Sequence, residues 1–138
     1  MPSYFDMISR ADFARILAAL APFIDRGGLS LGAALALEFI ALLVLFSALI
    51  VGRRFLFMLA GALAVAGAIV GALGSWLWYR DVCEVVAMAK TPPNAEELGD
   101  AADQIAFMLC APLSVATVLA VATVLAAILR REPPEGSV

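Results

Sequence analysis

The residue with the clearest capacity for chemistry is Glu38, an acid in the middle of a long apolar run, 29–52. It follows the start of that run by nine residues, which is about 14 Å along a helix and near the centre of a bilayer. An ionised, unpaired carboxylate at that depth is costly, so Glu38 is expected to be protonated or to have a polar partner. Two roles fit such a group: a relay for protons or cations, or a neutral hydrogen-bonding group that fixes helix assembly.

The chain offers few partners for Glu38. No Lys or Arg lies inside any of its three long apolar runs. The partner is therefore water, a hydroxyl group such as that of Ser114 or Thr117, or a residue of another chain. A relay ordinarily needs a file of ionisable groups, and none continues from Glu38 along this sequence. The assembly role is therefore the preferred interpretation.

Several classes of function lack the residues that they need. There is no His, which removes His-ligated metals and haem and the common nucleophile–His pairs. Cys83 and Cys110 lie far apart without a CxxC spacing, so neither a metal site nor a disulfide is expected. The formal net charge is −3, and no stretch clusters basic residues, which argues against nucleic acid as a partner. We expect no enzyme activity, no cofactor and no bound metal.

Composition identifies the class of protein. Of the 138 residues, 64% are hydrophobic, against roughly 45–50% in soluble domains. Three apolar runs at about 29–52, 55–79 and 105–129 are each long enough to span a bilayer. We therefore predict an all-α membrane protein with one three-span domain, 29–129, followed by a polar tail, 130–138. The first two spans form a tight hairpin, because only Gly52 to Arg54 separates them.

The first 28 residues are predicted to form an amphipathic helix lying on the membrane surface. Phe13, Ile16 and Leu17 begin an apolar face at helical spacing, which is too short to cross a bilayer. Ser9 and Asp12 resemble a capping box at the start of this helix. Pro22 is expected to bend or end it, and Gly27-Gly28 to form a hinge into the first span.

The segment 80–104 is predicted to be the main loop. It holds two basic and six acidic residues, for a net charge of −4. Its valines suggest a short surface helix that Pro92-Pro93 would end. Asn94 and Glu97 are spaced as a capping box for a helix that continues into the third span.

Small residues indicate where the spans pack, since helices in lipid associate by close backbone approach. Span two carries Gly67, Gly71 and Ser75 beside the row Ala60, Ala64 and Ala68. In span one, Glu38 lies on a similar stripe with Ala34, Ala41, Leu45 and Ala48, so Glu38 is expected to face another helix.

Aromatic and basic residues indicate where the spans leave the membrane. Trp76, Trp78 and Tyr79 are typical of the headgroup layer, and so are the pairs Arg53-Arg54 and Arg130-Arg131. Because both arginine pairs lie in short segments, the positive-inside rule favours a cytoplasmic C-terminus, with the N-terminus and loop 80–104 outside. The high Arg and Ala content suggests the inner membrane of a bacterium.

The sequence favours a small, non-catalytic accessory or assembly subunit of a larger membrane complex. Its partners would be other membrane subunits or further copies of itself, within the lipid bilayer. The alternative is a homo-oligomeric channel or proton-coupled carrier in which Glu38 lines the pathway.

Overall fold

The computed structural model describes residues 1–130 as an all-α chain. Three short helices come first: α1 (Tyr4–Ser9), α2 (Phe13–Ala18) and α3 (Leu20–Arg26). Three long helices follow: α4 (Gly28–Val51), α5 (Arg54–Met88) and α6 (Ala95–Leu129). The predicted fold class is confirmed, and each long helix is long and apolar enough to cross a membrane. The chain is thus a multi-pass membrane protein.

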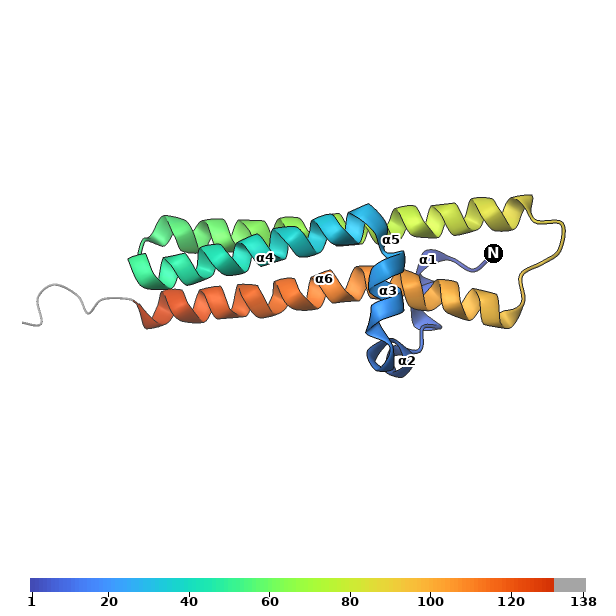
Figure 1. Ribbon diagram of the computed structural model, residues 1–138, viewed down its shortest axis with the longest axis horizontal. Helices are drawn as coiled ribbons and strands as arrows, with labels where there is room; N and C mark the ends of the chain where they lie inside the picture. Colours follow the sequence, from blue (N-terminus) through green and yellow to red (C-terminus); the bar gives the residue numbers. More distant parts are fainter. Residues whose placement is uncertain (131–138) are drawn as a thin grey trace, which may run out of the picture.

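The long helices form an antiparallel bundle in which α5 packs against both α4 and α6 (Figure 1). The 24 residues of α4 extend about 36 Å, whereas the 35 residues each of α5 and α6 extend about 52 Å. At the end of the bundle where α4 begins, α5 and α6 therefore extend well beyond the first residues of α4 (Figure 1). We call this projecting part, residues 80–101, the hairpin tip.

The tight turn between the first two spans is present as predicted. Gly52 ends α4 with φ of 76°, a left-handed conformation that glycine adopts without strain. Its N–H donates to the carbonyl of Ala48 over 2.7 Å. Arg53 alone then separates the glycine from α5.

The segment 80–104 is far more helical than a loop. Its valines prolong α5 to Met88 instead of forming a separate surface helix, because their spacing continues the helical period of span two. Only residues 89–94, which include both prolines, connect α5 to α6. The predicted capping box is confirmed: Glu97 N–H donates to the Asn94 side chain over 2.8 Å, and Asn94 N–H donates to Glu97 over 3.1 Å.

The N-terminal segment differs from the single helix predicted. The Ser9–Asp12 capping box is wrong, because the structure has Ser3 and Asp6 in those roles for α1, whereas Asp12 caps α2. The break before α3 falls at Ala19, whose φ of −139° is not helical. Pro22 lies in the first turn of α3. The backbone N–H that proline lacks would have no partner within the helix at that position, so Pro22 does not break α3.

The buried face of α5 consists mostly of small residues. Gly67, Gly71, Gly74 and Ser75 are buried there, along with Ala60 and Ala64, while Ala68 is partly buried. A Cβ atom added at Gly71 would lie 2.6 Å from Cγ of Pro112 and 3.2 Å from the carbonyl oxygen of Met108. The α5–α6 contact therefore depends on the absence of a side chain at this position.

Substituting Gly71 by Ala should destabilise the bundle by about 1–3 kcal/mol, because neither the proline ring nor the backbone carbonyl of α6 can yield cheaply. Thermal unfolding of the purified protein in mild detergent would measure the loss. Gly61→Ala is the matched control, since a Cβ at Gly61 of the same helix meets nothing within 4 Å. Equal melting temperatures for the two variants would contradict this packing.

Candidate functional site

Glu38 lies inside the bundle, on a buried stripe of α4. The stripe comprises Leu31, Ala34, Glu38, Ala41, Leu45 and Ala48. Glu38 itself is 2% exposed, and the side chain lies against α5 where a Cβ added at Gly67 would come within 2.7 Å of its Cγ. Gly67 thus leaves the space that the acidic side chain occupies.

Neither carboxyl oxygen of Glu38 has a hydrogen-bond partner among residues 1–130. On the side toward Arg53, the bundle core is an apolar cluster that includes Ala41, Ala64 and Ala116. On the other side lies a second apolar cluster, to which Leu31 and Phe107 belong. The acid is therefore a polar group without protein hydrogen bonds between two apolar layers.

The hydroxyl groups proposed as partners do not reach Glu38. Ser114 and Thr117 are exposed on α6, and Thr117 donates to the carbonyl of Leu113 over 2.8 Å. On this helix Pro112 and Ala116 face the bundle, so the helical period turns residues 114 and 117 outward. The structure thus keeps these three predicted site residues apart.

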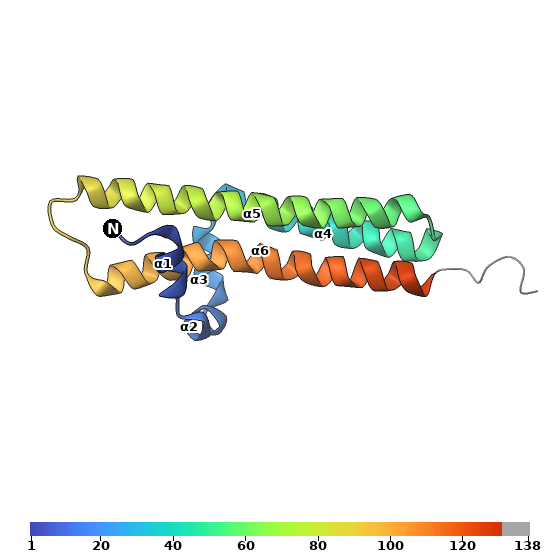
Figure 2. The same ribbon diagram turned by 180° about the vertical axis from the view of Figure 1, so that it is seen from behind.

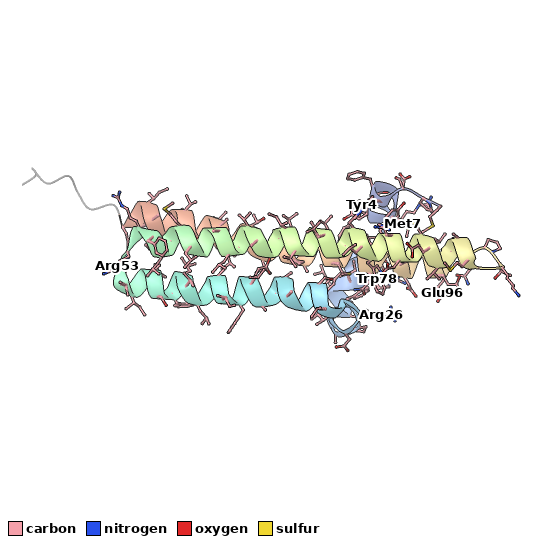
Figure 3. All side chains as sticks on the ribbon, turned by 90° about the horizontal axis from the view of Figure 1, so that it is seen from above. Tyr4, Met7, Arg26, Arg53, Trp78 and Glu96 are labelled. Atoms are coloured by element: carbon pink, nitrogen blue, oxygen red, sulfur yellow. The ribbon has the colours of Figure 1, made fainter. Side chains whose placement is uncertain are left out.

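A second site lies where α4 begins, and it is built by the N-terminal segment. We call residues 4–26, which contain α1, α2 and α3, the collar. In Figure 1, α3 crosses in front of α6, whereas Figure 2 shows α1 on the opposite side. Tyr4 and Met7 lie to one side of the bundle and Arg26 to the other (Figure 3). The collar therefore wraps around α6, and residues 102–108 of that helix are buried without interruption.

The strongest polar contacts of the collar converge on Asp103, which is 1% exposed. One carboxylate oxygen accepts from the backbone N–H of Asp12 over 2.7 Å. The other accepts from Nε of Arg15 over 2.6 Å and also from its Nη2. Arg15 pairs with Asp100 as well, at 2.9 Å. The hydrogen bond to Asp103 raises the pKa of the Arg15 guanidinium above its ordinary value.

Further hydrogen bonds fasten the collar on both sides of α6. The amide of Gln104 donates to the carbonyl of Phe23 in α3 over 3.0 Å. On the α1 side, Ser75 of α5 donates to the carbonyl of Ile105 over 2.8 Å and accepts from the hydroxyl of Tyr4 over 2.8 Å. These bonds join α1, α3, α5 and α6 at one level of the bundle.

The predicted interfacial aromatics lie at this same level. Tyr4 packs edge-on against Trp76 and Tyr79, with ring centroids 5.4 Å and 5.6 Å away. Tyr79 also donates to the carbonyl of Pro2 over 2.8 Å. Trp78 is partly buried at the base of the hairpin tip. These rings therefore hold the collar against α5, a contact that the sequence analysis did not predict.

The basic residues proposed as anchors gather at the opposite end. Arg53 and Arg54 are exposed at the α4–α5 turn, and Arg130 follows α6. A Cβ added at Gly52 would lie 2.8 Å from Nη1 of Arg130, so Arg130 reaches this turn. Arg131 and the rest of the predicted polar tail lie outside the described residues.

Sequence reasoning missed Arg15, Asp103 and Gln104, which it treated as part of a surface helix and a loop. One signal was available: Asp103 and Gln104 interrupt the run of small and apolar residues that leads α6 into its span. The structure leaves Cys83 and Cys110 as separate free thiols. It places no group of three potential metal ligands together within residues 1–130.

No protein-family model, curated protein or solved structure matches this chain. The role of these sites is therefore inferred from their geometry.

Arg15→Ala should loosen the collar, because it leaves the buried Asp103 carboxylate without its cation. We expect a partial loss of stability, smaller than that from breaking a fully buried pair, because the Arg15 side chain is 46% exposed. A Met7→Cys substitution in a background without Cys83 and Cys110 reports the loosening, since Met7 is fully buried on the face of α1 that packs against α6. Maleimide should label this cysteine faster in the Arg15→Ala protein.

Arg10→Ala provides the control, because Arg10 is exposed on the collar and pairs with no acid among the described residues. Adding Asp103→Asn to Arg15→Ala removes the unpaired charge and should recover part of the stability. Unchanged labelling in Arg15→Ala would show that the ion pair does not hold the collar.

Proposed function

We propose that this protein is a non-catalytic accessory or assembly subunit of a larger membrane complex, with the hairpin tip as its docking arm. The observation that carries the proposal is the extension of α5 and α6 beyond the level at which α4 begins. The collar fixes this extension to the bundle at Asp103, Gln104 and Ser75. A helical arm held rigidly at a membrane surface is suited to positioning a companion subunit.

The surface of the hairpin tip supports a docking role. Val85 and Met88 are 69% and 83% exposed, although they lie beyond the aromatic residues that mark the membrane boundary. The tip also carries five acidic side chains, whereas only Arg80 and Lys90 are basic in it. Exposed apolar residues with a polar rim are typical of protein interaction sites.

The membrane part of the chain also supports association. The helices turn broad apolar faces outward, including Phe39, Phe46 and Leu73, all about half exposed or more. These faces suit either lipid or the spans of other subunits. Glu38 is enclosed by its own chain, so in this proposal it is a neutral group within the bundle rather than a contact to a companion.

For orientation we propose the bacterial inner membrane with the hairpin tip and collar outside. Arg53, Arg54 and Arg130 gather at the end of the bundle opposite the collar. The positive-inside rule assigns that end to the cytoplasm, because the arginines lie in short segments next to the spans.

A photo-reactive amino acid placed at Val85 or Met88 tests the docking role in native membranes. We expect specific crosslinks to one companion protein, which should also co-purify with the unmodified chain in mild detergent. The same residue at Ile50, 82% exposed at the opposite end, is the control position. The proposal would be contradicted if the chain gave no crosslink at the tip and purified alone, yet supported full cellular function.

A second candidate function is proton or cation transport through Glu38. The two unpartnered carboxyl oxygens favour it, because a buried acid without a protein partner is open to a proton or an ion. Against it, the apolar cluster around Ala64 and Ala116 closes the bundle on the Arg53 side. The accessory role therefore remains the primary proposal.

Reconstitution into liposomes distinguishes the two functions. As an accessory subunit, the chain should pass protons no faster than empty liposomes, and Glu38→Gln should change nothing, because an amide replaces a neutral acid of similar size. The variant should also melt within about 1 kcal/mol of the parent protein. A proton flux that the parent protein carries and Glu38→Gln abolishes would establish the transport role instead.

A further inference from the structure

The hairpin tip contains a cavity of about 460 Å³ between the end of α5 and the start of α6. Its walls are mainly apolar, with Val82, Val85 and Val86 on one side and Leu98 and Ala101 on the other. Binding pockets for small molecules measure about 300–1,000 Å³ and are mostly apolar, with a few polar groups. The cavity thus has the size and lining of a ligand site, and it shares Val85 with the proposed docking surface.

Trp78 lines the cavity where the hairpin tip meets the bundle. Its indole nitrogen is buried and has no acceptor among residues 1–130. The nitrogen is closed off from solvent, so the part of Trp78 that the cavity offers to a ligand is its aromatic ring.

The charged groups at the cavity wall are both acidic. Asp81 of α5 and Glu97 of α6 both line the cavity, and the remaining polar side chain is that of Thr91. None of the lining residues, all within the described part of the chain, is basic. The nearby Arg80 is directed to Glu84, with 3.7 Å between Nη2 and Oε1. The field inside the cavity therefore favours a cation and disfavours an anion.

We propose that this cavity binds a lipophilic cation, an apolar molecule of small-ligand size that carries a protonated amine. The apolar body fills the space between the valines and Leu98. The amine lies near the carboxylates of Asp81 and Glu97. The aromatic ring of Trp78, at the base of the cavity, adds a cation–π attraction to the positive charge.

The fluorescence of Trp78 gives a direct test. Trp76→Phe leaves Trp78 as the only tryptophan, because the chain has two. The purified full chain in a non-ionic detergent is titrated with a bromine-tagged long-chain alkylamine, since bromine quenches a tryptophan that it contacts. The matched alcohol and carboxylate of the same chain length are titrated in parallel. We expect saturable quenching, with the highest affinity for the amine and the lowest for the carboxylate.

Two further variants, both in the Trp76→Phe background, separate binding in the cavity from partition into the micelle. Ala101→Phe fills the cavity and should abolish the saturable phase for all three probes. The double variant Asp81→Asn, Glu97→Gln should weaken the binding of the amine roughly threefold to tenfold, the effect expected of exposed ion pairs. Its affinity for the alcohol should be unchanged. Both acids are exposed, so this double variant should fold normally.

Three results would overturn the proposal: quenching that does not saturate, quenching that is equal in the Ala101→Phe protein, or equal affinities for the amine and the alcohol. Because the crosslinking experiment at Val85 and Met88 uses a different readout, binding of a lipophilic cation stands or falls independently of the docking role.

Discussion

The fold depends on the hydrogen bonds and the ion pair of one buried acid, Asp103, which lies where α6 enters the bundle from the hairpin tip. Asp103 is buried among helices, and a carboxylate there is tolerated only with donors to both of its oxygens. Those donors come from Asp12 and Arg15, about ninety residues earlier in the chain. The N-terminal segment must therefore pass around α6, and this path explains why residues 102–108 are buried on every side of the helix.

The two acids that are buried within residues 1–130 have different surroundings. Asp103 accepts hydrogen bonds from a backbone N–H and a guanidinium at the edge of the bundle. Glu38 lies deeper, against Gly67, with no protein donor among the described residues. The first acid holds two segments together, whereas the second occupies space that a glycine leaves open. A structural role is thus demonstrated by contacts for Asp103, while the role of Glu38 depends on what meets its free oxygens.

Three features that concern binding gather at the same end of the molecule: the collar, the exposed apolar residues of the hairpin tip, and the cavity beside Trp78. The collar presents Phe5, Leu17 and Ile24 outward, which suits contact with the headgroup layer. Because the collar is bonded to both α5 and α6, it holds the two helices together at the base of the hairpin tip. Within residues 1–130, the opposite end carries the turn at Gly52 together with Arg53, Arg54 and Arg130.

The sequence by itself determined the three spans, the tight turn at Gly52, the small-residue face of α5 and the placement of Glu38 toward another helix. Each of these follows from local hydropathy, helical period or glycine conformation, which neighbours along the chain decide. Only the tertiary structure decided that Ser114 and Thr117 face away from Glu38, that the valines after Tyr79 prolong α5, and that Arg15 meets Asp103. These features depend on which helix faces fill the bundle and on contacts across some ninety residues, and an isolated charge in a sequence does not reveal its distant partner.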